Sequence, residues 1–333
     1  MKKRIDWVDA LKGFGIILVV TGHADTPESL MGWIYGFHMP LFFMLSGLVT
    51  KKSDAPMGEW LKKHVKNLLW PYFIFGIVEV LFYIVTEGLD GTLTGIHLLK
   101  KITAIAYSNY IFDHNYTGVI WFLTCLFVTE FLFFVIHKYI KNRALQVIVT
   151  LALGILGLEY DSLFTFKPPF FADVALTALV FYSMGFAVKD ILKLKGSKWE
   201  FLLGFVLMVA GSVVGLYNQN ALNGKHVSML YLRYGNPVLF LISTFLLLIG
   251  FLFFFCGLQD FMETPLAVAL EYIGRNSLVI FSVHLMIMHV MKDIMADDYG
   301  VWFSETITTL FFSIVATMII NKYFRKVIYL TAK

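Results

Sequence analysis

The sequence has 333 residues, of which 58% are hydrophobic, 17% aromatic and only 15% charged, and its formal net charge is +4. A soluble domain carries about 25% charged residues, so this composition, with a mean hydropathy of +0.73, predicts that lipid is the main solvent of the chain. It excludes an ordinary cytosolic enzyme, a disordered chain and a nucleic-acid-binding protein.

Ten apolar runs follow one another along the chain, each near the roughly 20 residues that a helix needs to cross a bilayer. They cover residues 9–23, 32–49, 68–85, 118–136, 144–158, 172–188, 199–217, 236–257, 277–295 and 302–320. Backbone groups in hydrocarbon must find partners within their own segment, so we expect these runs to be helices. The predicted fold class is therefore all-α, a single polytopic membrane domain over residues 1–333 with about ten transmembrane helices.

The basic residues are distributed unevenly between alternate loops of this layout. With the N-terminus in the cytoplasm, most of the 27 lysines and arginines fall in cytoplasmic segments, as the positive-inside rule requires. We therefore expect both chain ends in the cytoplasm. The first run lacks a small-residue cleavage site, which indicates a retained span rather than a signal peptide. Cys125 and Cys256 lie in apolar runs, which argues against disulfides or a cysteine metal site.

The first predicted span carries three ionisable residues, Asp9, Lys12 and His23. Eleven residues turn a helix through about 1100°, or three turns plus roughly 20°, so Lys12 and His23 share a face about 16 Å apart along the axis. At least one therefore lies in hydrocarbon, where ionisable groups normally face a wet cavity and have a function. Asp9 is close enough to pair with Lys12. Alternatively, Lys12 extends to the membrane surface and His23 caps the helix.

The second predicted span contains Phe37-His-Met-Pro-Leu-Phe-Phe-Met-Leu-Ser-Gly. His38 is expected at a depth similar to that of His23, either as a catalytic residue or as a hydrogen-bonded core histidine. Pro40 removes a backbone hydrogen bond. Ser46 and Gly47 permit close helix approach, in a packing seam or beside a ligand.

Polar residues also interrupt the fourth and ninth spans. Arg275 and Asn276 are expected at the inner mouth of the ninth span, and His284 near its middle, where histidine is uncommon enough to mark a site. The fourth span carries Trp121 near its outer end and Glu130 deeper, where a carboxylate is costly without a partner.

A cluster of lysines follows the second span. Lys62 and Lys66 lie one helical turn apart, and Lys63 is adjacent to them. Such a patch suits phosphate groups or anionic lipid headgroups, although the positive-inside rule alone also explains it.

Several of these motifs resemble the acyltransferase-3 family of multi-pass membrane acyltransferases, and within it the branch similar to fucose 4-O-acetylases. The likeness rests on the Lys12 to His23 spacing, the segment from Phe37 to Gly47, Trp70-Pro71-Tyr72, Trp121-Phe122-Leu123 and the stretch from Asn276 to His284. The resemblance implies transfer of an acyl group, usually acetyl from acetyl-CoA, to a hydroxyl of a cell-envelope sugar. A bacterial cytoplasmic membrane is the location it implies.

The same resemblance implies that His23 is the essential catalytic residue and that Lys12 is important for donor binding or function. Arginine is common at the position of Lys12, and a lysine there changes bidentate contacts to phosphate or carboxylate. We also expect no appended soluble domain, which removes the usual hint to the acceptor.

The candidate residues fall into three groups. The expected catalytic residues are His23, Lys12, Asp9, His38 and His284. The residues expected to hold acetyl-CoA are Lys62, Lys66, Arg275, Asn276 and Ser46. A carbohydrate or glycolipid acceptor is expected at Trp121 and Glu130. No metal is expected, and membrane lipids are the remaining partners.

Acyl transfer to a hydroxyl needs a base for the attacking oxygen and a hydrogen-bond donor for the carbonyl oxygen. Imidazole suits the first task because its pKa lies near the working pH. We expect His23 to deprotonate the sugar hydroxyl, directly or after receiving the acetyl group. His38, Ser46 or His284 would then stabilise the oxyanion.

The sequence is also compatible with two other classes of protein, a transporter and a scaffold. In a transporter of a small polar substrate such as an amino acid or a sugar, Asp9, Lys12 and His23 would form a substrate or proton site. The sequence shows no internal repeat, which weakens a transporter built from two similar halves. A scaffold without chemistry would leave the intramembrane charges without a purpose.

Overall fold

The computed structural model describes residues 6–109, 118–191, 195–295 and 301–329. These residues are mostly helical and include no β-strand, with one isolated bridge between Ser228 and Arg233. Within them, eight helices are long and apolar enough to cross a membrane. The prediction of an all-α polytopic membrane protein is confirmed.

All ten predicted spans fall in helical segments, but the first and the fifth differ from the other eight. The first, α1 (Asp6–His23), has 18 residues and carries Asp6, Asp9 and Lys12. The other, α8 (Arg143–Leu158), has only 16 residues. The number of ten spans and the cytoplasmic placement of both chain ends stay predictions.

The helices form two compact units, which divide within α10 (Ala172–Ile191) and α15 (Trp302–Tyr323). The first unit comprises Met1–Thr50 and Phe181–Ile314. Besides α1 and the adjoining parts of α10 and α15, it holds α2 (Glu28–Tyr35), α3 (His38–Val49), α11 (Lys198–Gln219), η3 (Asn220–Leu222), α12 (Pro237–Gly257), η4 (Gln259–Phe261), α13 (Pro265–Arg275) and α14 (Ser277–Met295). The prediction of one domain over residues 1–333 is not tested by this division.

The second unit comprises Lys51–Val180 and Val315–Lys333. Besides α8 and its parts of α10 and α15, it holds α4 (Met57–His64), the π-helix η1 (Val65–Leu69), α5 (Trp70–Leu89), α6 (Gly95–Tyr107), α7 (Trp121–Tyr139), α9 (Tyr160–Leu163), η2 (Pro169–Phe171) and α16 (Arg325–Ile328). The helices α4, η1 and α5 follow one another without a break. Lys62, Lys63 and Lys66 therefore lie in a helical segment that continues directly into α5 as one candidate membrane span.

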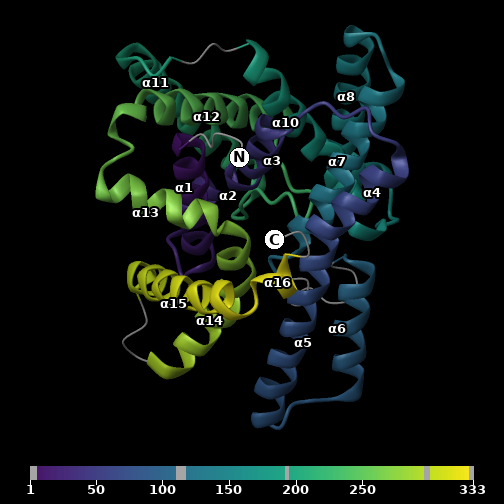
Figure 1. The fold of residues 1–333 in the computed structure, drawn as a ribbon, viewed down its shortest axis with the longest axis vertical. Coiled ribbons are helices and arrows are strands. Elements are labelled where there is room, and N and C mark those ends of the chain that lie inside the picture. The colour runs from purple at the N-terminus through teal and green to yellow at the C-terminus, as the bar shows by residue number, and fades with distance from the viewer. Residues whose placement is uncertain (1–5, 110–117, 192–194, 296–300, 330–333) are drawn as a thin grey trace. The chain divides into compact units, whose positions relative to one another are not determined.

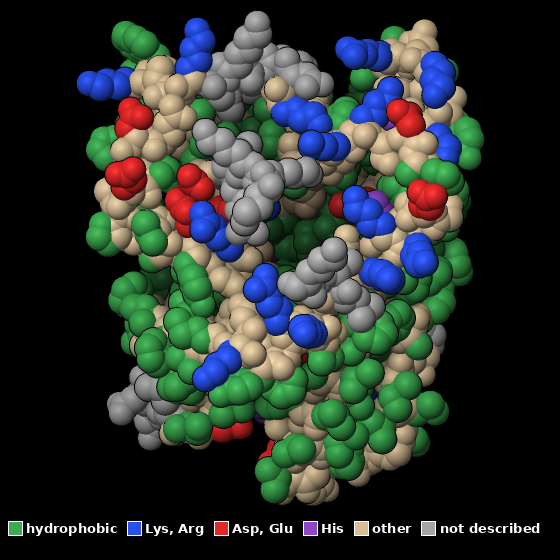
Figure 2. Space-filling model, in the orientation of Figure 1, with side chains coloured by type: hydrophobic (Ala, Val, Ile, Leu, Met, Phe, Trp, Pro, Cys, Tyr) green, Lys and Arg blue, Asp and Glu red, His purple; other side chains and the backbone are tan. Residues whose placement is uncertain are grey.

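Large apolar side chains cover much of the surface, as a lipid solvent requires. Ile77, Leu81 and Val85 are more than half exposed along α5, as are Phe205 and Val213 along α11. Figure 2 shows hydrophobic side chains over a large part of the face in view. In a soluble protein such exposure would cause aggregation, whereas here it indicates the surface that contacts the hydrocarbon chains of membrane lipids.

Glycines bring α1 into backbone contact with α13 in the first unit (Figure 1). A Cβ atom at Gly13 would lie 1.9 Å from the carbonyl oxygen of Leu270, and one at Gly274 would lie 1.8 Å from that of Asp9. Only glycine permits this approach, which is how helices associate closely where no hydrophobic effect drives them together. The N-terminal half of α1 is thereby fixed against α13.

A second glycine seam joins α3 to the part of α10 in the same unit. A Cβ atom at Gly47 would lie 1.9 Å from the carbonyl oxygen of Tyr182, and one at Gly185 would lie 1.9 Å from that of Met44. Gly47 therefore lies in a helix-packing seam, which is one of the two interpretations that its sequence context allowed; the other was a position beside a ligand.

The second predicted span is divided into two helices rather than one. α2 ends at Tyr35 and α3 begins at His38. Pro40 explains the division, since a proline inside a helix lacks an N–H and its ring clashes with the carbonyl four residues earlier, here that of Gly36. The Gly36 carbonyl instead accepts a hydrogen bond of 3.0 Å from the Thr244 hydroxyl of α12, so it stays satisfied away from water.

We predict that Gly274→Ala destabilises the first unit. The added methyl group would overlap the backbone of α1, and overpacking of a tight contact typically costs about 1–3 kcal/mol. Thermal unfolding in detergent should show a clearly lower melting temperature for this variant than for Gly88→Ala, where an added Cβ meets nothing within 4 Å. Equal melting temperatures for the two variants would contradict the seam.

Candidate active site

Three of the predicted histidines, from three different helices, belong to one group of rings in the first unit. The ring of His23, at the end of α1, lies 5.3 Å from that of His284 in α14, measured between centroids. His38, at the start of α3, joins the group through Tyr35, whose ring is 4.8 Å from that of His38 and 6.2 Å from that of His23. The structure thus brings together the three imidazoles that the sequence proposed for catalysis.

Two further members of this group were missed in the sequence. Tyr35 ends α2, and His226 lies in the segment between η3 and α12, with its ring 4.3 Å from that of Tyr35. We call His23, Tyr35, His38, His226 and His284 the histidine group. Among the described residues, no cluster of three or more His, Cys, Asp or Glu has an arrangement suited to a metal ion.

Hydrogen bonds to the backbone indicate the protonation of the two buried histidines. Nδ1 of His38 lies 2.9 Å from the carbonyl oxygen of Ile34, and Nδ1 of His284 lies 2.8 Å from that of Phe281. A carbonyl oxygen only accepts, so both Nδ1 atoms carry the proton and the neutral rings present a lone pair at Nε2. Nε2 of His284 is buried and has no hydrogen-bond partner among the described residues.

His23 differs from these two residues in its surroundings. Its side chain is half-buried, whereas His38 and His284 are buried. Its ring lies against those of Tyr35 and His284, and neither contact is a hydrogen bond. The imidazole of His23 is thus the reachable member of the pair with His284, and its ring nitrogens are available to a substrate.

The N-terminal end of α1 has a different ionic partner from the one expected. The Arg275 guanidinium lies 3.3 Å from Asp9 and 3.3 Å from Asp6, and it donates a hydrogen bond of 2.6 Å to Glu271. Three carboxylates therefore surround the arginine that the sequence assigned to acetyl-CoA phosphates. The pairing of Asp9 with Arg275 crosses from α1 to α13 and could not be read from helix spacing.

Lys12 lies on the same helix as His23, as the sequence requires for a shared face. α1 is continuous from Asp6 to His23, so the eleven-residue separation applies without interruption. Lys12 and His23 are both partly accessible, while the residues beside each of them are buried.

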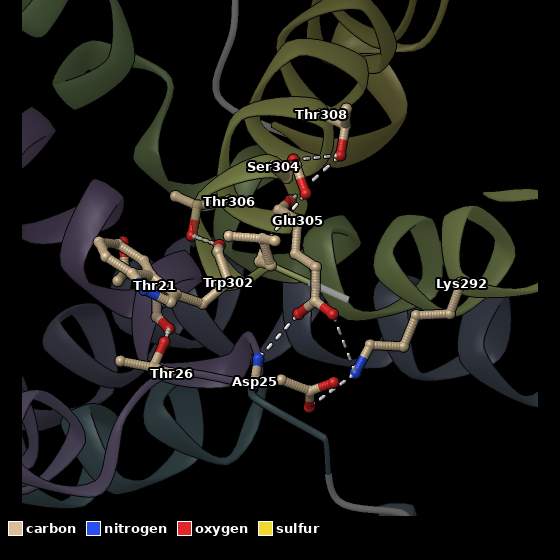
Figure 3. A network of polar contacts seen from close by, with 10 residues as sticks. Thr21, Asp25, Thr26, Lys292, Trp302, Ser304, Glu305, Thr306 and Thr308 are labelled. Atoms are coloured by element: carbon tan, nitrogen blue, oxygen red, sulfur yellow. Dashed lines mark hydrogen bonds and ion pairs between the residues drawn. The ribbon is translucent and has the colours of Figure 1, made fainter. Parts of the chain in front are cut away.

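A polar network holds the turn that follows His23 (Figure 3). The Asp25 backbone N–H donates a hydrogen bond of 2.8 Å to Oε2 of Glu305, a carboxylate whose side chain is only 1% exposed. The Lys292 ammonium donates to Asp25 over 3.0 Å and lies 3.8 Å from Oε1 of Glu305. One lysine therefore compensates two carboxylates, and the network joins the turn after α1 to α14 and α15.

Two groups at this end of the unit have shifted pKa values. The hydrogen bond from Lys292 lowers the pKa of Asp25, and the charge of Lys292 adds to this effect while burial opposes it. Burial lowers the pKa of His226, and the positive charge of Arg233 lowers it further against the influence of Glu28. His226 is therefore a neutral imidazole at pH 7.

In the second unit, the predicted patch of lysines borders a half-buried acid. Lys62 and Lys63 are exposed and Lys66 is half-buried. Glu130, for which the sequence offered no partner, has its Oε2 atom 3.5 Å from Nε2 of His64. The His64 ring stacks on Trp60 at 3.7 Å, which fixes the imidazole in front of the carboxylate.

The remaining predicted residues have mainly local contacts. Trp121 is buried in α7 with its ring 5.6 Å from that of Phe171. The Ser46 hydroxyl donates to the carbonyl oxygen of Phe42, and the Asn276 amide donates to that of Tyr272. The binding functions assigned to these residues stay predictions.

Comparison with known families addresses the chemistry of this site. The family described as "Acyltransferase domain" matches residues 5–322, which is nearly the whole chain and includes every member of the histidine group. The chain belongs to the acyltransferase-3 family. No curated protein and no solved structure shows significant similarity.

Membership of the acyltransferase-3 family makes the chain a membrane acyltransferase, an enzyme that transfers acyl groups. The family assignment covers both compact units, since its match extends from α1 into α15.

We predict that the Asp25–Lys292 contact gives the protein a specific acid sensitivity. The folded pKa of Asp25 lies below its ordinary value of 3.8, so the contact stabilises the protein above that value and the contribution is lost as pH falls through the folded pKa. Asp25→Asn should therefore lower the melting temperature at pH 7, and the difference from the natural protein should shrink below pH ~4.

The matched control is Asp260→Asn, at an exposed aspartate of η4 in the same unit. It should leave the pH dependence of the melting temperature unchanged. A difference between the natural protein and Asp25→Asn that stays constant from pH 7 to pH 3 would contradict the expected ionic contribution.

Proposed function

We propose that this acyltransferase-3 protein is an O-acetyltransferase of a bacterial cytoplasmic membrane that moves acetyl from acetyl-CoA to a hydroxyl of a cell-envelope or exported sugar. The observation that carries the proposal is the reachable imidazole of His23, which has no hydrogen bond to a described residue and lies beside the buried ring of His284. The sugar acceptor rests on the resemblance to fucose 4-O-acetylases. The family supports acyl transfer itself.

In the proposed reaction His23 acts as the general base. A ring nitrogen of His23 accepts the proton of the acceptor hydroxyl while the oxygen attacks the thioester carbonyl carbon. A C–O bond forms and the carbonyl electron pair moves to oxygen, giving a tetrahedral intermediate. The C–S bond then breaks, the electron pair leaves with sulfur, and the His23 imidazolium returns its proton to the CoA thiolate.

His284 supports the charged form of His23 in this reaction. Its Nε2 atom presents a lone pair and has no partner among the described residues. When His23 becomes an imidazolium, both of its nitrogens carry protons, and the lone pair of His284 stabilises the positive charge of the neighbouring ring. A buried acceptor without a partner is costly in the resting protein, and a role in catalysis explains why it is kept.

For the donor, we propose that basic residues bind the phosphate groups of acetyl-CoA. The exposed ammonium groups of Lys62 and Lys63 and the half-buried Lys66 suit this task. Arg275 is less suited to bind phosphate directly because three carboxylates already surround its guanidinium. We assign Arg275, together with Asp9, to the support of the helix that carries Lys12 and His23.

Replacing His23 tests this proposal. His23→Ala should reduce transfer of labelled acetyl from acetyl-CoA by about 100- to 10,000-fold, the usual contribution of a positioned base. The measurement uses detergent-purified protein with membrane glycans as acceptor. His289→Ala, which removes an exposed histidine elsewhere on α14, is the matched control and should retain full transfer.

Thermal unfolding of both variants shows whether they fold. Undiminished transfer by a folded His23→Ala protein would remove His23 from the mechanism. Absence of any acetyl transfer by the natural protein, with glycan acceptors from several envelope fractions, would overturn the proposed substrates.

A further inference from the structure

The histidine group contains fewer hydrogen-bond donors than its composition suggests. His38 and His284 use their Nδ1 protons on backbone carbonyls and present lone pairs at Nε2. Neither neutral ring can therefore donate to a developing oxyanion at Nε2, although the sequence offered both for that purpose. The Ser46 hydroxyl, the third candidate, donates to the carbonyl oxygen of Phe42. The proposed acyl transfer therefore requires another donor.

Tyr35 has the properties that this donor requires. A phenol donates a hydrogen bond at every pH well below 10. The Tyr35 ring contacts those of His23, His38 and His226, and Tyr231 lies near enough to interact with it electrostatically. No hydrogen bond joins the Tyr35 hydroxyl to a described residue. The side chain is half-buried, like His23. Its hydroxyl is therefore available to a bound substrate.

The protein holds the Tyr35 ring in place without engaging its hydroxyl. The rings of His38 and His226 pack against it at interplanar angles of 65° and 59°. On the side of α1, a Cβ atom at Gly22 would lie 3.1 Å from Cε2 of Tyr35. A glycine directly before His23 therefore lets the tyrosine ring lie against the helix that carries the proposed base.

The break between α2 and α3 places this residue. Tyr35 is the last residue of α2 and His38 is the first of α3. In an unbroken helix, residues three apart lie on adjoining positions of one surface, but here the chain turns at Gly36 and Phe37. The Phe37 backbone has a φ of −147°, outside the helical range. The turn directs the end of α2 toward His226 as well as His38.

We propose that Tyr35 is a further catalytic residue, whose hydroxyl donates a hydrogen bond to the thioester carbonyl oxygen as it becomes an oxyanion. This proposal rests on the acyl transfer proposed above. The Tyr35 proton stays on the phenol throughout. The proton of the acceptor hydroxyl passes to His23 and then to the thiolate, and the oxyanion electron pair re-forms the carbonyl when the C–S bond breaks. Tyr35 binds the carbonyl oxygen more strongly in the intermediate than in the thioester, which is what raises the rate.

Tyr35→Phe tests this assignment because it keeps the ring and removes only the hydroxyl. The expected result is a fall in kcat of about 100- to 1,000-fold, the usual effect of losing one oxyanion donor. KM for acetyl-CoA should change by less than about twofold, because the interaction forms mainly in the transition state. Tyr217→Phe, at an exposed tyrosine of α11 in the same unit, is the matched control and should keep both constants.

Two further measurements keep the test decisive. Stabilisation of Tyr35→Phe by CoA, measured as a rise in melting temperature equal to that of the natural protein, shows that the variant is folded and binds the donor. Gly22→Ala would push the Tyr35 ring by a few tenths of an ångström without removing the hydroxyl. It should lower kcat, by less than Tyr35→Phe does, and leave KM for acetyl-CoA unchanged.

The outcomes separate this inference from the proposed function. Loss of transfer in His23→Ala together with an unchanged kcat in Tyr35→Phe would overturn the assignment of Tyr35 alone. A raised KM for acetyl-CoA with an unchanged kcat would assign Tyr35 to donor binding and also overturn it. Absence of acetyl transfer in the natural protein would instead overturn the proposed function, on which the assignment rests.

Discussion

Pro40 imposes the constraint on which the candidate active site depends. Proline has no N–H to donate to the Gly36 carbonyl, and its ring clashes with that carbonyl in a continuous helix. The second apolar segment therefore divides into α2 and α3, and Tyr35 and His38 lie on the two sides of the division. The Thr244 hydroxyl satisfies the released carbonyl. Without this division Tyr35 and His38 would belong to one regular span, and His226 would have no helix end to pack against.

Because little water reaches the interior of a membrane protein, the polar residues around the site must be satisfied by one another. The cations at the two ends of α1 have carboxylate partners, as a medium poor in water requires. Arg275 meets Asp6, Asp9 and Glu271 at one end of α1, while Lys292 meets Asp25 and Glu305 at the other. His23 therefore ends a helix that is held by glycine contact and ion pairs at its start and by a buried carboxylate just beyond its end. A reactive imidazole so positioned loses little freedom when a substrate binds.

Much of this arrangement could be predicted from the sequence, because it depends on local pattern. The length of the apolar runs gave the helices, and the rarity of histidine in apolar segments marked His23, His38 and His284. Partners across the fold could not be predicted. The pairing of Asp9 with Arg275 joins residues far apart in sequence, and Glu130 meets His64 across two helices. His226 lies outside every predicted span, where a polar residue is ordinary and does not mark a site. The position of Tyr35 depends on the break between α2 and α3, which Pro40 indicated only in part.

Chemical modification of the histidines tests whether His23 is the reachable imidazole of the active site. Diethyl pyrocarbonate reacts with accessible imidazoles, and mass spectrometry assigns the modified residues. We expect that in the folded protein His23 is modified, that saturating CoA protects it, and that the buried His38 and His284 stay unmodified. Modification of His23 at the same rate with and without CoA, or faster modification of His284 than of His23, would show that His23 is not the reachable imidazole of the acyl-transfer site.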